Sequence, residues 1–555
     1  MRIDITNIDV MVNLLSSLLI TASSRYIATG NCELNAVYFL TTIVIFVFLL
    51  LCNGVLKYFI RNHYNESVEY KISNPIIQWL FLSKWSLFRI AIVIFLLWLP
   101  LLLALYPGTL INDTWGQLQQ FMMFTENGMV HKNVLTDHHP FFDTLFMGVL
   151  IVPFAKATGL WHISIFLYVL LQAAITSVTF SYSILYIYKK LRIGLKVTFG
   201  MMLMYGLLPV YAASVQTVSK DALFSWVYVL FFIFYMEIVR TKGTELNNKS
   251  FFIKFMVSIV FCILTKKVGF YVVFVSLLSL YLTQVHNKKK ILIGLLISLS
   301  LMGIILPGTR KLLGIQPGGL QEMFSIPFQQ TARFVKYHPD EVTEEEKIVL
   351  DKVLGYKDLA NRYDPLSADP VKGYSQRGSG KDYFLYLQVW AHEGIRHPGT
   401  YLEATAAMLS GWFSFNEYNP LMNMEWHNQL DPRLIPGWVP IRGNFFTITA
   451  NNFQTIFNEI YKIPFFTVFL SYVFYAALVP GFLTISVFRK HRRGDIQYWL
   501  IFIPMISSIV LGCWLAPVSV HFEGRRYLYP IVYTLPLLIS WSLFIYKHES
   551  EENID

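Results

Sequence analysis

Charged residues are scarce in this chain. Only 14% of its 555 residues are Asp, Glu, Lys or Arg, whereas a soluble domain carries about 25%. Hydrophobic residues make up 55%, and the mean hydropathy is +0.47. They are grouped in runs long enough to cross a bilayer rather than spaced along amphipathic faces. The composition excludes a soluble globular protein and predicts an all-α polytopic membrane protein.

Cysteine is scarce as well. Cys52, Cys262 and Cys513 fall inside apolar runs, and Cys32 stands alone near the start. The sequence has no CxxC pair, and the long polar segment 307–463 has no cysteine at all. These absences exclude a disulfide framework and a thiolate metal site.

The apolar runs predict eleven membrane-spanning helices, or twelve if residues 8–23 also cross. Those first residues make a poor cleavable signal and are expected to form a short amphipathic or marginal helix. Segment 251–265 is short for a crossing, which needs about 20 residues, so it is either broken or continuous with its neighbour through Thr265, Lys266 and Lys267. The predicted spans are 36–56, 87–105, 160–188, 196–215, 222–239, 251–265, 268–285, 291–306, 464–487, 497–516 and 530–546.

The net charge of +10 comes from short basic tracts between the apolar runs, not from a contiguous soluble face. Short loops rich in Lys and Arg mark the cytoplasmic side of a membrane protein. We therefore expect membrane lipids and no nucleic acid as partners, a multi-pass membrane location and a cytoplasmic C-terminus. The basic loops that fall on one side of the predicted topology are 57–86, 189–196, 240–254, 286–290 and 489–493, with Lys547 after the last span.

The same topology predicts three parts. Residues 1–306 form an N-terminal transmembrane bundle with a first outer loop at 106–140. Residues 307–463, which hold 17 of the 35 acidic residues, form a mostly helical extracellular domain inserted before the last three helices. Residues 464–555 supply those helices and a short tail.

Local signals predict helices within the outer domain. Thr343 followed by Glu346 is a capping box, and a second helix is expected after Pro398. The domain also contains Trp412, Trp426 and Trp438. These tryptophans could stack on a sugar or pack in a core.

The first outer loop carries the strongest chemical signal. The chain leaves the membrane at Tyr106-Pro107-Gly108, presents Asp113 soon after, and reaches His138 and His139 before Pro140. A carboxylate just outside the bilayer is placed to deprotonate a hydroxyl acceptor. Two imidazoles can position the acceptor, bind a phosphate or complete a metal site. The alternatives are a helix N-cap for Asp113 and a structural corner for His-His-Pro.

Cations at the outer ends of spans are a second signal. Lys220, Lys266, Arg525 and Arg526, with Tyr527 beside them, run against the positive-inside trend. Charges near hydrocarbon are costly and usually have partners or line a cavity. A lipid phosphate or pyrophosphate is a suitable partner, since Arg offers a bidentate fork. The alternative is that these side chains snorkel to ordinary headgroups.

A metal requirement is only weakly indicated. No HExxH or DxD motif occurs. Asp113, Asp137, His138 and His139 could hold a divalent metal only if the fold brings them together. We assign no cofactor with certainty and leave a divalent metal possible.

Several strings in residues 87–540 carry a resemblance to an uncharacterised family of polytopic membrane proteins from Gram-positive bacteria. The strings are YPGTLINDTWGQLQQ, DHHPFFDTL, SIPFQQTARFVKYHPDEVTEEEK, YDPLSADPVK, HPGTYLEAT and RRYLYPIVYTLP.

The first outer loop and the topology also resemble, more distantly, the GT-C superfamily of glycosyltransferases, which use polyprenyl-phosphate-linked sugars outside the membrane. That resemblance implies a GT-C-like bundle with Asp113 as base or metal-positioning group. This chain departs from the pattern, since it has Asn112-Asp113-Thr114 rather than paired acids and a mid-chain outer domain. Function inferred from fold is analogy.

We therefore predict a membrane glycosyltransferase. It would pass a sugar from a polyprenyl-phosphate donor to a cell-envelope glycan or lipid acceptor on the outer face. Asp113 would be the base, His138 and His139 would position substrate, and the outer cations would hold the lipid phosphate. The rival hypotheses are a cell-surface polysaccharide polymerase or ligase and, among non-enzymes, a transporter or flippase of lipid-linked saccharides. A transporter tends to show two similar halves, and no internal repeat is visible.

Overall fold

The computed structural model describes residues 5–31, 35–63, 75–283, 285–373, 378–415, 443–488, 496–514 and 524–552. Cys32, Trp426, Trp438 and the basic tract 489–493 lie outside the described residues.

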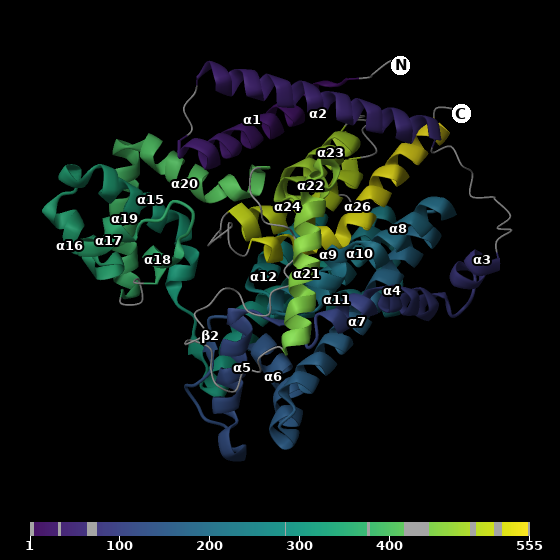
Figure 1. The fold of residues 1–555 in the computed structure, drawn as a ribbon, viewed down its shortest axis with the longest axis horizontal. Helices are drawn as coiled ribbons and strands as arrows, with labels where there is room; N and C mark the ends of the chain where they lie inside the picture. The colour runs from purple at the N-terminus through teal and green to yellow at the C-terminus, as the bar shows by residue number, and fades with distance from the viewer. Residues whose placement is uncertain are drawn as a thin grey trace.

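The described chain is almost entirely helical, which confirms the all-α fold class (Figure 1). The N-terminal helices are α1 (Asn7–Thr29), α2 (Ala36–His63), α3 (Pro75–Phe81), α4 (Ser86–Ala104), α5 (Asn112–Phe124), α6 (Phe141–Thr158), α7 (Trp161–Lys189), α8 (Leu195–Leu207), α9 (Pro209–Val215), α10 (Lys220–Arg240), α11 (Lys249–Thr265), α12 (Lys267–Leu282), α13 (Lys288–Ser300) and α14 (Leu306–Leu313). Then follow α15 (Ser325–Tyr337), α16 (Glu344–Leu354), α17 (Tyr356–Arg362), α18 (Asp369–Lys372), α19 (Gly380–Arg396), α20 (Pro398–Phe413), α21 (Asn444–Tyr461), α22 (Pro464–Leu470), α23 (Val479–Phe488), α24 (Phe502–Ile509) and α26 (Arg525–Glu552).

Eight of the described helices are long and apolar enough to cross a membrane, or nine if α8 and α9 form one span bent by 49°. Three further apolar helical segments are shorter: α12, Phe474–Val487 and Tyr498–Trp514. A polytopic membrane protein is thereby confirmed, while the count of eleven or twelve crossings stays a prediction. The first helix, α1, has 23 residues and extends beyond the predicted 8–23.

One apolar helix lies outside the predicted spans, and one of the two alternatives for segment 251–265 is settled. The apolar helix α6 was missed, because its 18 residues follow the polar loop directly and are separated from α7 only by Gly159 and Leu160. The segment 251–265 is not continuous with its neighbour. Lys266 is extended (φ −155°, ψ 132°) and separates α11 from α12.

Loops predicted to share one side do lie together at one end of the bundle. Near the ends of α7 and α10, Glu237 binds Arg240 through two bonds of 2.7 Å and lies 3.5 Å from Lys190. The His286 amide donates to the Lys242 carbonyl in the adjacent turn. A cavity of about 440 Å³ opens here and includes Lys84 in its lining. Four of the basic loops therefore lie at one end of the bundle.

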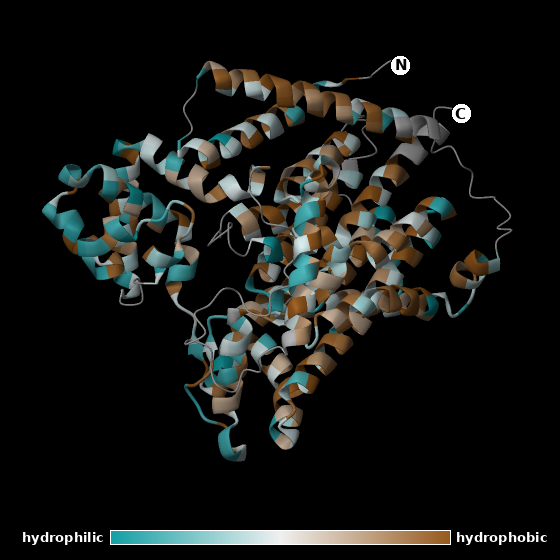
Figure 2. Cartoon of the chain, in the orientation of Figure 1, coloured by the Kyte–Doolittle hydropathy of each residue, from teal (hydrophilic) through white to brown (hydrophobic). Residues whose placement is uncertain are grey.

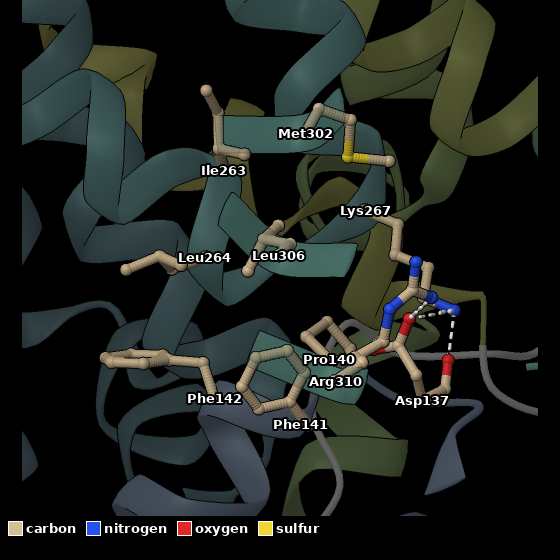
Figure 3. A pocket seen from close by; sticks show the side chains of 10 residues that line it. All are labelled: Asp137, Pro140, Phe141, Phe142, Ile263, Leu264, Lys267, Met302, Leu306 and Arg310. Carbon is tan, nitrogen blue, oxygen red and sulfur yellow. Dashed lines mark hydrogen bonds and ion pairs between the residues drawn. The ribbon is translucent and has the colours of Figure 1, made fainter. Parts of the chain in front are cut away.

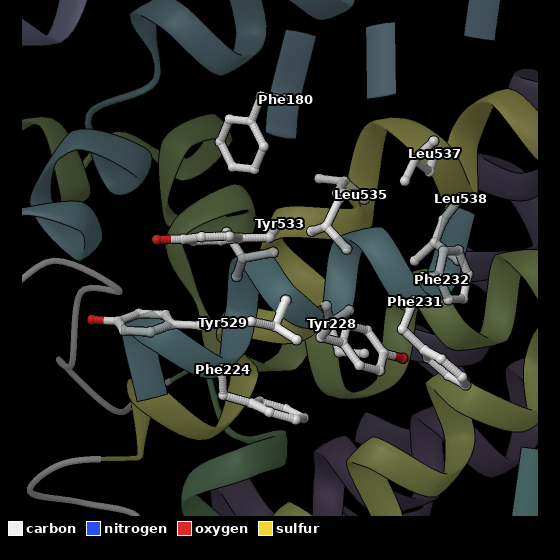
Figure 4. Close-up of a cluster of buried hydrophobic side chains, with 14 of the residues drawn as sticks. Phe180, Phe224, Tyr228, Phe231, Phe232, Tyr529, Tyr533, Leu535, Leu537 and Leu538 are labelled. Atoms are coloured by element: carbon white, nitrogen blue, oxygen red, sulfur yellow. The ribbon is translucent and has the colours of Figure 1, made fainter. Parts of the chain in front are cut away.

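The core of the bundle is aromatic, as Figure 4 shows for α7, α10 and α26. Phe180 stacks on Tyr205 at 3.9 Å and meets Tyr533 edge-on at 5.1 Å. The Tyr205 hydroxyl donates to the Tyr533 carbonyl at 2.8 Å, and the Trp98 ring donates to the Tyr205 carbonyl at 2.9 Å. Buried polar atoms among apolar helices need such partners, because no water reaches them.

Helices α15–α19 form a lobe at the left of Figure 1 that is markedly more hydrophilic than the bundle (Figure 2). It has its own hydrophobic core, which includes Phe328, Leu350 and Tyr386. Helix α20 begins at Pro398 as predicted and leads back to the bundle. There the Trp412 ring is fully buried and donates to the Cys513 carbonyl at 3.0 Å. Trp412 is therefore a core residue and not a sugar-stacking surface.

The predicted capping box is confirmed at the start of α16. The Thr343 hydroxyl accepts from the Glu346 amide at 3.2 Å, and the Glu346 carboxylate accepts from the Thr343 amide at 2.9 Å.

We expect Thr343→Ala to lower the free energy of unfolding of the outer lobe by about 1 kcal/mol, the usual value of an N-cap hydroxyl. Thermal denaturation followed by limited proteolysis of the purified protein measures this. Thr343→Ser, which keeps the hydroxyl, is the matched control and should retain nearly all of the stability. Equal loss in both variants would contradict the assigned cap.

Candidate functional site

Two short parallel strand pairs fix the first outer loop against other loops. Strand β1 (Thr109–Leu110) pairs with β3 (Thr217–Val218), and β2 (Thr136–Asp137) pairs with β4 (Gln316–Pro317). Gly108 is needed beside β1: its φ is +113°, and a Cβ there would lie 2.9 Å from the Gln216 carbonyl. The strands thus join segments that are far apart in sequence.

The β1–β3 pair brings the starts of α5 and α10 together. Each strand is followed directly by its helix, and the Thr114 hydroxyl of α5 donates to the Val218 carbonyl at 2.5 Å. Helices α12 and α26 begin at the same place, where Lys266 contacts Asp221 and Arg526 contacts Asp113. Four helix N-termini therefore meet at this end of the bundle. Such ends attract negative charge, because their amides and the helix dipole point outward.

Asp113 lies at the centre of this meeting point. One of its carboxylate oxygens, Oδ2, is 2.8 Å from both Lys220 Nζ and Arg526 Nη1. The other, Oδ1, is 3.7 Å from His139 Nε2. These four side chains are each between 14% and 23% exposed. Residues 413 positions apart therefore share one partly buried ion cluster.

A second carboxylate extends the cluster inward. Asp221 is fully buried and lies 2.7 Å from Lys266 Nζ and 3.8 Å from Arg526 Nε. The Tyr527 ring lies beneath both cations, 5.2 Å from Lys266 and 5.4 Å from Arg526. Arg526 thus bridges the two acids, and Tyr527 adds a cation–π contact to each cation.

The protonation of His139 follows from its neighbours. Its Nδ1 lies 2.6 Å from Lys220 Nζ. An ammonium group can only donate, so Nδ1 must accept and Nε2 must carry the hydrogen. Burial lowers the pKa of His139, and Lys220 lowers it further, to about 3. The imidazole is therefore neutral at physiological pH and presents an N–H toward Asp113.

Burial and the neighbouring charges shift the pKa of Asp113 in opposite directions. Burial raises its pKa, but the positive charges of Lys220 and Arg526 outweigh burial and hold that pKa well below the usual value. Asp113 is therefore ionised across the physiological range, and the two cations are neutralised by it.

Most of the predicted site residues meet in this cluster. Asp113 contacts His139, Lys220 and Arg526. Tyr527 lies against Arg526, and Lys266 joins the cluster through Asp221.

Two predicted site residues lie beside the cluster. The exposed His138 ring packs against His139 at 4.4 Å, with its Nδ1 3.6 Å from Glu322. Arg525 is buried elsewhere, and its amide donates to the Tyr472 hydroxyl at 3.0 Å. Of the two adjacent arginines, it is Arg526 that contacts Asp113.

A small pocket of about 50 Å³ lies next to the cluster (Figure 3). Its polar end is Asp137, which lies 2.8 Å from Arg310 and 3.7 Å from Lys267. Its remaining wall is apolar and includes Phe141 and Leu306. Charged and apolar groups are therefore adjacent just outside the ion cluster.

The acids of this loop do not fit a divalent metal. Asp113 is neutralised by Lys220 and Arg526, and Asp137 by Arg310 and Lys267. A metal would have to displace these cations, and Lys220 also occupies His139 Nδ1. Hard divalent ions prefer uncompensated carboxylate oxygens.

Sequence reasoning missed two acids. Asp221 follows Lys220 directly, and its pairing with Lys266 across two spans could have been suggested by their opposite charges at neighbouring span ends. Asp143, in α6, is fully buried with both carboxylate oxygens unpartnered among the described residues. In the sequence, only its position at the end of the string DHHPFFD pointed to a role for Asp143.

The low pKa of His139 predicts a specific loss of stability in acid. The unfolded imidazole binds a proton below about pH 6.5, whereas the folded one stays neutral down to about pH 3. The free energy of unfolding should therefore fall on acidification through this window, by up to about 1.4 kcal/mol per pH unit. Thermal unfolding at pH 6.5, 5.5 and 4.5 should fall less steeply in His139→Gln than in the wild type. His131→Gln removes an exposed imidazole from the same loop as a control, and parallel slopes for wild type and His139→Gln would contradict the assignment.

Comparison with known proteins places the chain in a family without assigning it an activity. No curated protein and no solved structure matches it. The model of a family of unknown function (DUF6020) matches residues 23–554, which is almost the whole chain, and this protein therefore belongs to that family.

Proposed function

We propose that the protein is a membrane glycosyltransferase of GT-C type. It takes a sugar from a polyprenyl-phosphate donor and passes it to a hydroxyl of a cell-envelope glycan or lipid, at the outer face of a bacterial plasma membrane. The observation that carries the proposal is the cluster of Asp113, Lys220, Arg526 and His139 at four helix N-termini. It combines an ionised carboxylate with cations suited to a phosphate.

The cluster supplies each group that glycosyl transfer requires. Asp113 removes the proton of the acceptor hydroxyl as its oxygen bonds to the anomeric carbon. The bond from that carbon to the phosphate oxygen breaks, and its electron pair stays on the phosphate. Lys220 and Arg526 stabilise this developing charge.

Donor binding also changes the basicity of the Asp113 carboxylate. Without a donor, Lys220 and Arg526 are held by Asp113 at 2.8 Å. A phosphate that takes over both cations removes the charges that depress the pKa of Asp113, so this pKa rises and the carboxylate becomes a stronger base. The base is thus activated by the substrate whose transfer it assists.

His139 and the nearby pocket have supporting roles. The neutral imidazole directs its Nε2–H to Oδ1 of Asp113, the carboxylate oxygen that Lys220 and Arg526 leave to other partners. The apolar wall that includes Phe141 and Leu306 suits contact with the isoprene carbons next to the donor phosphate.

Asp113→Asn should reduce sugar transfer by 10²- to 10⁴-fold, the usual contribution of a general base. The assay is purified protein in nanodiscs with a radiolabelled polyprenyl-phosphate sugar and a lipid or glycan acceptor. Glu126→Gln, which removes an exposed acid from the same loop, is the control and should keep full activity. Normal transfer by a folded Asp113→Asn protein would contradict the proposal.

Arg526→Gln should lower kcat/KM for the donor by roughly 10- to 100-fold, as expected for one lost hydrogen bond between charged groups. Arg240→Gln is the matched control. It removes an ion-paired arginine from the opposite end of the bundle and should leave kcat/KM unchanged. Equal effects of the two substitutions would argue against phosphate binding by Arg526.

The same assay separates the rival functions. A polymerase or ligase would consume a lipid-linked repeat unit rather than a monosaccharide carrier, and a flippase would move labelled lipid across the bilayer without forming a glycosidic bond. Either result, with no transfer from the monosaccharide donor, would overturn the proposed reaction.

A further inference from the structure

Two helices of the outer lobe end in the same way at the same place. His338 is the C-cap of α15 and His397 is the C-cap of α19, and each histidine is followed by a proline. Their backbones match closely, with φ −131° and ψ 49° at the first and φ −131° and ψ 66° at the second. The two imidazoles lie against each other, with centroids 4.0 Å apart and ring planes tilted by 35°.

Glu341 reaches both rings. Its Oε1 is 3.4 Å from His338 Nδ1, and its Oε2 is 2.7 Å from His397 Nε2. One ligand atom from each of the three residues lies within 4.8 Å of the other two. Ligands of a tetrahedral zinc ion, about 2.1 Å from the metal, are about 3.4 Å apart. Small side-chain rotations are enough to close the three atoms around one ion.

The orientation of His338 leaves its inner nitrogen available. His338 Nε2 lies 3.0 Å from the Thr400 hydroxyl. Hydrogen bonding of the outer ring nitrogen fixes the tautomer and the ring plane, as is usual for metal-binding histidines. In the tautomer in which Nε2–H donates to Thr400, the Nδ1 lone pair is available to a metal ion held beside Glu341.

The electrostatic environment of His338, Glu341 and His397 favours a cation. The negative ends of α15 and α19 converge here, and each helix end stabilises positive charge. The nearby Arg396 does not occupy the carboxylate of Glu341, because its guanidinium binds Glu346 at 2.9 Å and 3.1 Å and the Glu341 backbone carbonyl at 2.8 Å. The two histidine side chains are 26% and 27% exposed, so solvent and ions reach them.

We infer that His338, Glu341 and His397 form a binding site for a divalent transition metal, zinc by the chemistry of its ligands. Two imidazoles and one carboxylate are a typical three-residue zinc set, and the fourth position opens to solvent. The site is separate from the cluster at Asp113 and does not depend on the proposed transfer reaction.

A metal at this position would clamp the outer lobe. His338 and Glu341 belong to the turn between α15 and α16, and His397 lies at the junction of α19 and α20. Helix α20 packs along α15 and α1 and carries Trp412 into the bundle. The ion would therefore tie the lobe to the helix that connects it with the membrane part.

The test is zinc binding by the full-length protein in detergent, with its affinity tag removed and metals stripped by a chelator. After incubation with zinc sulfate and gel filtration, metal analysis should find about one zinc per chain, and the Tm should rise with zinc. His338→Gln and His397→Gln should lose the bound zinc and the shift in Tm. Glu341→Gln, which keeps the side-chain shape, should weaken binding by tenfold or more. Cobalt should give the absorption of a tetrahedral site in the wild type.

His392→Gln is the matched control. His392 is another lobe histidine that bonds a glutamate, Glu346 at 2.8 Å, but it is not one of the three ligands. It should bind zinc like the wild type. The inference is overturned if the wild type binds no zinc, or if folded His338→Gln and His397→Gln proteins bind as much zinc as His392→Gln.

Discussion

The ion cluster around Asp113 depends on positive charges that lie at helix N-termini. Lys220 opens α10, Arg526 lies in the first turn of α26, and Lys266 caps α12. The dipole of each helix disfavours a cation at its N-terminus, so these residues are stable only with anions close by. Asp113 and Asp221 meet that need. The strand pairs, the glycine before β1 and the aromatic core beneath all serve to hold the acids and cations within ion-pair distance.

Much of this arrangement was predictable from the sequence. Helical class and membrane location follow from apolar runs, whose length is fixed by the bilayer. The importance of Asp113, Lys220 and Arg526 follows from charge at the edge of hydrocarbon, where an unpartnered ion is costly. The α16 cap was predictable because a capping box is complete within four residues.

The features that the sequence did not predict depend on packing between segments that are far apart in the chain. No local pattern indicates that Lys220 neutralises Asp113, since 107 residues separate them. Arg525 and Arg526 could not be distinguished, because neighbouring helix residues point about 100° apart and the rotation of α26 is set by its contacts. Helix α6 was missed because it follows the polar loop directly and contains Asp143 and Lys156, so it is less apolar than α7. The convergence of His338 and His397 likewise arises only when α15 and α19 pack together.

The position of Arg526 has a consequence for biosynthesis. Asp113 and Lys220 are inserted early, but Arg526, the second cation that binds Asp113, lies in the last described helix, after more than nine-tenths of the 555 residues. During translation the ion cluster is incomplete, and it closes only when α26 packs against α10. A chain that terminates before α26 therefore leaves Asp113 without one of its two cations.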